Sequence, residues 1–117
     1  MFPKVFKAIR TPAVAAIVDD RISGHGGAAR TDKRPYITWQ IVTADPYSNL
    51  SSAPGGDFTT VQIECFHEDE AGAEDLALAV RAALDALLIV NRIVIDTLDS
   101  DTQLYRVGLE ADFVDQR

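Results

Sequence analysis

The sequence has only one cysteine and no long apolar run. These two features exclude an internal disulfide and a membrane-spanning helix. Cys65 alone cannot form an internal disulfide, which suits synthesis in a reducing cytoplasm. No apolar stretch approaches the roughly 20 residues of a membrane-spanning helix. The first residues are not followed by the apolar core of a signal peptide. We therefore expect no membrane association.

Motifs for catalysis are also missing. The chain has no P-loop and no G-x-S-x-G nucleophile motif, and the glycines around His25 lack the spacing of a dinucleotide-binding loop. Cys65 and His67 supply too few ligands for a closed zinc site, and the acidic run 68–75 lacks the spacing of a calcium loop. We predict no enzyme activity, no metal and no cofactor.

Size and charge favour one globular domain that binds other proteins. The chain has 117 residues, of which 47% are hydrophobic and 25% charged, so we expect a single domain over residues 1–117. The net charge of −7 argues against a nucleic-acid coat. The balance is +4 over residues 1–43 and −11 over residues 44–117. This split suits a basic side that meets a neighbour's acidic side, although chance clustering on a solvated surface would also produce it.

Two helical regions are predicted from apolar spacing. Residues 2–18 place apolar side chains three and four positions apart, and Thr11-Pro12 interrupts them with a capping residue and a proline suited to a first helical turn. Residues 68–90 form the dominant helix, which begins with acidic residues and ends at Asn91. Its apolar stripe consists of Leu76, Val80, Ala83, Leu84, Leu87 and Leu88.

Four segments show the alternation of half-buried strands: residues 36–43, 58–67, 92–98 and 103–115. On the third strand we expect Ile93 and Ile95 on one face and Val94 and Asp96 on the other. Loops are predicted over residues 23–34 and 44–57, where glycine and proline are frequent.

This order predicts an α+β fold: a four-stranded antiparallel sheet of two hairpins, a long helix between them, and an N-terminal helix packed on one face. Cys65 is expected in the core, and Glu64 and Glu110 on polar strand faces in contact with water. The inner face is almost wholly apolar and consists of Trp39, Ile41, Val61, Ile63, Tyr105, Val107, Leu109 and Phe113.

The series of segments resembles the phage tail-completion proteins, also described as minor tail or tail-to-head joining proteins. The resemblance covers nearly the whole chain and rests on pieces in order, none of them a catalytic motif. After the N-terminal helix they are VDDRI at 18–22, PYITWQ at 35–40, VQIECF at 61–66, ALAVRAAL at 77–84, and the ending from Tyr105-Arg106-Val107 through Asp112-Phe113. The Gly-rich insert at 24–29 departs from the family pattern, which runs promptly from Arg-Ile into a segment with proline.

The resemblance implies a structural protein of long-tailed phages or prophages, assembled in the bacterial host cytoplasm and located in the virion tail. It is similar to tail terminators, which form a ring, commonly sixfold, at the head-proximal end of the tail tube. Such a ring stops tube growth and offers a docking surface to the head connector protein. The implied partners are copies of the chain, the tail tube protein and the connector, with DNA only as passing cargo. Subunits can stay monomeric until they meet the tail.

A ring requires one surface to meet a different surface of the next subunit, and the charge split fits this requirement. We predict that the two long loops and the basic stretch beside the first of them contact the neighbours. The residues concerned are Arg30, Lys33, Arg34, Tyr47, Asn49 and Leu50.

Two other interpretations stay open. A small-ligand-binding or hydrolytic α+β domain would wrap a curved sheet around a pocket, and it would need convergent polar groups on the inner face. A regulatory or toxin-type prophage protein would have a specific partner and no place in the virion.

Overall fold

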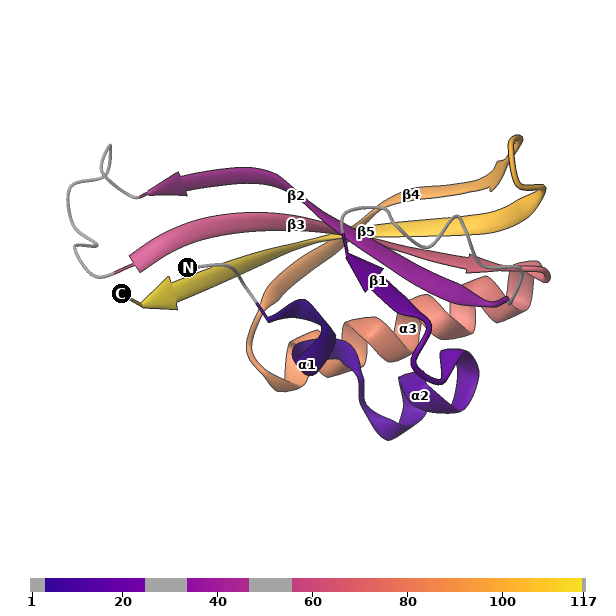
Figure 1. The fold of residues 1–117 in the computed structure, drawn as a ribbon, viewed down its shortest axis with the longest axis horizontal. Coiled ribbons are helices and arrows are strands. Elements are labelled where there is room, and N and C mark those ends of the chain that lie inside the picture. The colour runs from indigo at the N-terminus through magenta and orange to yellow at the C-terminus, as the bar shows by residue number, and fades with distance from the viewer. Residues whose placement is uncertain (1–3, 25–33, 47–55, 117) are drawn as a thin grey trace.

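The computed structural model describes residues 4–24, 34–46 and 56–116 and shows a five-stranded sheet with three helices on one of its faces (Figure 1). The α+β class, the two hairpins and the long helix between them are confirmed. The elements are α1 (Val5–Ile9), α2 (Pro12–Val18), β1 (Ile22–Gly24), β2 (Tyr36–Pro46), β3 (Gly56–His67), α3 (Glu70–Ala86), β4 (Val90–Asp99) and β5 (Leu104–Gln116).

The sheet has the order β1-β2-β3-β5-β4, and the prediction of four antiparallel strands is wrong in one respect. Ile22 to Gly24, expected to lead into a loop, form an additional edge strand parallel to β2, with Ile22 opposite Ile37. Arg21 fixes this contact, because its carbonyl accepts from Ile37 N at 2.9 Å and its Nε donates to Pro35 O at 2.7 Å. Three residues are too few for a detectable alternation, so periodicity could not find β1.

The interruption of the N-terminal helix at Thr11-Pro12 is confirmed. Thr11 has extended backbone angles, its side chain accepts from Val14 N at 3.4 Å, and Pro12 occupies the first turn of α2. The two short helices bury Val5, Ile9, Val14 and Val18 in the same core.

Helix α3 is shorter than predicted, because it begins at Glu70 and ends at Ala86. Leu88 has a φ of 59°, so the chain leaves the helix there and Asn91 lies in β4. The part of the predicted stripe inside the helix is buried, whereas Leu87 and Leu88 beyond its end are exposed. At the start of the helix, His67 Nδ1 accepts from Asp69 N at 3.0 Å, and a Cβ at Gly72 would overlap the His67 ring.

The core lies between α3 and the inner sheet face, where Val61, Ile63, Leu109 and Cys65 are fully buried. The core position predicted for Cys65 is confirmed, and Trp39 is partly buried against the same cluster. A Cβ at Gly24 would lie 2.6 Å from the Trp39 ring, so this ring packs directly on the backbone of β1.

The face assignment predicted for the third strand is wrong. β4 carries an irregularity between Ile93, which pairs with Leu109, and Ile95, which pairs with Gly108. The extra residue reverses the alternation, so Asp96 shares the inner face with Ile93, and Ile95 packs over Gly108 on the outer face. Edge strands accommodate such bulges readily, and alternation alone cannot reveal them.

Burial of Cys65 leads to a prediction about alkaline stability. Burial raises the pKa of its thiol well above the ordinary value, and the Glu64 carboxylate adds to the shift. Above the ordinary thiol pKa of about 8.5 the unfolded chain loses this proton first. The contribution of the thiol to stability is therefore complete below that pH and falls above it, by up to about 1.4 kcal/mol per pH unit.

Denaturant unfolding at about pH 7.5 and about pH 10 compares the wild-type chain with Cys65→Ala. We expect a steeper alkaline loss of stability in the wild type. An identical loss in both proteins would show that the thiol titrates alike in the folded and unfolded states.

Candidate assembly surfaces

Most of the predicted contact residues lie outside the described part of the chain: Arg30, Lys33, Tyr47, Asn49 and Leu50. Arg34 is described, and it is exposed just before Tyr36 on β2. Burial raises the pKa of the Tyr36 phenol, and the positive charge of Arg34 partly opposes this shift. Arg34 therefore lies near the Tyr36 phenol. The contact role of all six residues stays a prediction.

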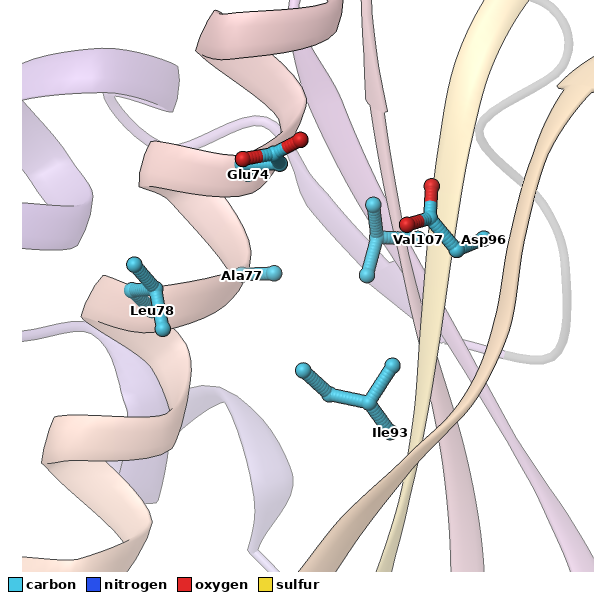
Figure 2. A pocket seen from close by; sticks show the side chains of 6 residues that line it. All are labelled: Glu74, Ala77, Leu78, Ile93, Asp96 and Val107. Carbon is cyan, nitrogen blue, oxygen red and sulfur yellow. The ribbon is translucent and has the colours of Figure 1, made fainter.

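A groove opens between α3 and β4 on the helix face of the sheet (Figure 2). It has a volume of about 290 Å³ and is lined by Glu74, Ala77, Leu78, Ile93, Asp96 and Val107. Ala77 and Val107 form its buried floor, and Leu78 and Ile93 are 57% and 42% exposed. In Figure 2 the carboxylates of Glu74 and Asp96 lie toward the same end of the groove, and Ile93 lies toward the other. None of the described residues that line the groove is basic.

Strand β4, which forms one wall of this groove, is an edge strand with unusual apolar exposure. It pairs with β5 on one side only. Its exposed apolar side chains are Val90, Ile93, Val94 and Leu98. Native proteins normally protect such an edge with charges, bulges or a covering chain. The bulge at Val94 and the carboxylate of Asp96 give partial protection, and the apolar side chains remain accessible to another chain.

The opposite face of the sheet carries a second apolar cluster and a partly buried ion pair. Tyr36 and Phe66 stack with ring centroids 4.9 Å apart and, with Leu104, form this outer-face cluster. Beside it, Arg106 Nε donates to Glu64 Oε1. Glu64 is only 9% exposed, so its predicted exposure to water is wrong. Arg106 on the neighbouring strand pairs with this carboxylate, and the alternation of a single strand cannot show such a contact.

A hollow of about 340 Å³ lies over the Tyr36–Phe66 stack and the Glu64–Arg106 ion pair, and these four residues are the outer-face site. Asp99, Asp101 and Thr102 at the β4–β5 turn add to its lining, so its polar groups are mainly acidic. Asp99 accepts from Thr102 N at 3.0 Å and from Thr102 Oγ1 at 2.6 Å, and these bonds lower the pKa of its carboxyl. These two hydrogen bonds stabilise the β4–β5 turn, so the Asp99 carboxylate has a structural role.

A third polar group joins β4 to β5. Arg92 donates to Glu110 at 2.9 Å and to Asp112 at 3.1 Å, and Thr60 donates to the Asp112 carboxylate at 3.1 Å. The bond to Asp112 is the main reason why the pKa of Arg92 is raised. Every charge in this group has a partner, as expected for a structural network rather than a reactive one.

Among the described residues, a basic surface lies at α1. Lys4, Phe6 and Lys7 are exposed, and Phe6 is 41% exposed. Residues 4–18 contain no acidic side chain. Arg10 at the end of α1 is paired with Asp20, so Lys4 and Lys7 carry the unbalanced positive charge of this face.

The described residues contain no group of three or more His, Cys, Asp or Glu side chains that could hold a metal ion. Within the same residues no helix is long and apolar enough to cross a membrane. Cys65 lies in the core, and His67 accepts a hydrogen bond from Asp69 N at the start of α3. Both side chains therefore have structural roles.

Sequence reasoning missed the groove because its residues come from separate elements. Leu78 was the available signal, since it is a large apolar residue outside the buried stripe of α3. A second signal was the series of apolar residues in β4, because these residues do not alternate regularly with polar ones.

The packed core, the open sheet edge and the oppositely charged surfaces define an α+β protein with surfaces suited to contact with other chains. The chain belongs to the family described as tail completion protein gp17, whose model matches residues 3–114. It is therefore a structural protein of the phage tail, located in the virion.

The fold is also found in a solved virus-like particle. A chain of the "Virion of native gene transfer agent (GTA) particle" is similar with a TM-score of 0.66 and 17% identity, and the match covers 97% of this chain and 92% of that chain. No curated protein sequence matches the chain.

Proposed function

We propose that residues 1–117 form one domain that assembles into a ring, commonly sixfold in tail terminators, at the head-proximal end of the tail tube. The ring ends tube growth and presents a docking surface to the head connector. Membership of the tail-completion family and the likeness to a chain of a gene transfer agent virion support this proposal.

The observation that carries it is the exposed edge β4 beside the acidic groove. An edge strand with this much apolar surface favours coverage by another chain. The basic α1 face is a different surface from the acidic groove, and closed rings need contacts between unlike surfaces. The predicted loop residues, including Arg34 beside the outer-face site, are the proposed contacts to the tube and the connector.

The proposal is tested with tail tubes assembled without this protein. Purified protein is added, then fresh tube protein, and the tubes are imaged by negative-stain electron microscopy. We expect a ring at one end of each tube and no further growth there. A strict monomer in the presence of tubes, or tubes that elongate equally at both ends, would contradict the proposal.

A further inference from the structure

The groove between α3 and β4 has the chemistry of a site for a basic, apolar protein segment. Its exposed walls are Leu78 and Ile93, and Glu74 and Asp96 supply two carboxylates with no base among the described lining residues. Apolar contact would gain from removal of these side chains from water, and a cation beside the carboxylates would offset their loss of hydration. Its volume of about 290 Å³ falls just below the usual range of small-molecule pockets, about 300–1,000 Å³.

The chain itself carries a segment with the matching chemistry. Helix α1 exposes Phe6 between Lys4 and Lys7, so one aromatic ring stands among two positive charges. Aromatic side chains are enriched at the centres of protein interfaces, and charges around them can fix the partner and its register. The charges of these two surfaces are complementary, because residues 4–18 hold no acid and the described lining of the groove holds no base.

One molecule cannot bring these two surfaces together. α1 and α2 pack against α3, and α2 leads into β1 at the sheet edge opposite to β4. The groove lies between α3 and β4 (Figure 2). The α1 face and the groove therefore flank α3 on different sides, which is the arrangement that a head-to-tail contact between copies requires.

We propose that the groove receives α1 of the next copy of this chain, with Phe6 between Leu78 and Ile93 and with Lys4 and Lys7 beside Glu74 and Asp96. This inference rests on the ring in the proposed function and assigns the contact that would close it. Each subunit donates one α1 and receives one, so the contact repeats around the ring without a symmetric pair of faces.

Charge reversal and its repair test the contact in the full chain with tail tubes present. Lys7→Glu and Glu74→Lys are made singly and together, and Asp75→Lys is the matched control, because Asp75 is exposed on α3 without lining the groove. Analytical ultracentrifugation and electron microscopy measure association. We expect each single reversal to weaken association at least about tenfold, and the double variant and the control to assemble like the wild type.

The outcomes separate the contact from the ring itself. Rings of normal stability in both single variants would overturn the contact and leave the proposed function intact. Loss of assembly in both singles without recovery in the double would show that Lys7 and Glu74 do not face each other. Wild-type protein that stays monomeric with tubes would contradict both proposals. Thermal unfolding checks that each variant folds.

Disulfide trapping identifies the occupant directly. Phe6→Cys and Leu78→Cys are introduced separately into a Cys65→Ala background, and the two proteins are mixed and oxidised with tubes. We expect disulfide dimers in the mixture and few in either protein alone. A chain with both cysteines should give a ladder of covalent oligomers. Dimers within one single-cysteine protein would indicate a symmetric contact, and cross-links only to the tube protein would assign the groove to the tube; either result would overturn the proposal.

Discussion

Replacement of Arg106 by methionine is expected to lower the free energy of unfolding by about 3 kcal/mol. Methionine keeps much of the apolar stem and removes the guanidinium that donates to Glu64. Glu64 is 9% exposed beside the Tyr36–Phe66 stack, so its carboxylate would be left poorly solvated. Because Arg106 is itself 27% exposed, the loss belongs at the lower end of the range for broken buried pairs.

The matched control is Arg92→Met, the same substitution one strand away. Arg92 is 44% exposed, and its partners Glu110 and Asp112 are 30% and 18% exposed. They keep more contact with water than Glu64 does, so the loss should be smaller. The double variant Glu64→Gln/Arg106→Met should recover part of the stability, because it removes the buried charge. Denaturant unfolding gives the free energy of unfolding of the wild type and of the three variants. Equal losses for the two arginine variants, or no recovery in the double, would show that Glu64 does not depend on Arg106.

Leu76→Ala and Leu78→Ala are expected to separate folding from assembly. Leu76 is fully buried in the core, so its truncation leaves a cavity and should cost about 3 kcal/mol. Leu78 lies two residues along α3 and is 57% exposed, so its truncation should change the free energy of unfolding by less than about 0.5 kcal/mol.

Leu78→Ala should weaken assembly even though it hardly changes the free energy of unfolding. Without this side chain the groove loses one apolar wall, so ring formation on tail tubes should weaken although the monomer remains stable. Unfolding curves and electron microscopy of the same preparations provide both measurements. If Leu78→Ala unfolds at a clearly lower denaturant concentration than the wild type, or if it assembles normally, the assignment of this residue to an interface is contradicted.

The longer elements could be predicted from the sequence because their periodicity reports burial directly. The alternation of β5 places Val107, Leu109 and Phe113 inside, and the structure has them buried. The capping role of Thr11 also follows from local chemistry and is confirmed. β1 escaped prediction because its three residues depend on pairing with β2, which lies after a long segment of chain. The bulge at Val94 reversed the faces of β4 for a similar reason, since register depends on the partner strand.

The candidate site was predictable only in its chemistry. The excess of acidic residues after position 43 and of basic residues before it is visible in the sequence, and it reappears as the groove carboxylates and the α1 lysines. The particular residues were not predictable, because Glu74 and Asp96 become neighbours only when α3 packs beside the edge strand. Five of the six residues predicted from loop composition lie outside the described chain, and their role stays a prediction.

We expect the protein to complete tails as a stoichiometric structural part. The most direct test of this expectation is a titration of purified protein into filled heads and tails that both lack it, with joined particles counted by electron microscopy. We predict that joining rises with added protein until every tail holds a ring, and that the protein stays at the junction. Complete joining at far fewer than one ring per tail, or equal joining without the protein, would contradict it.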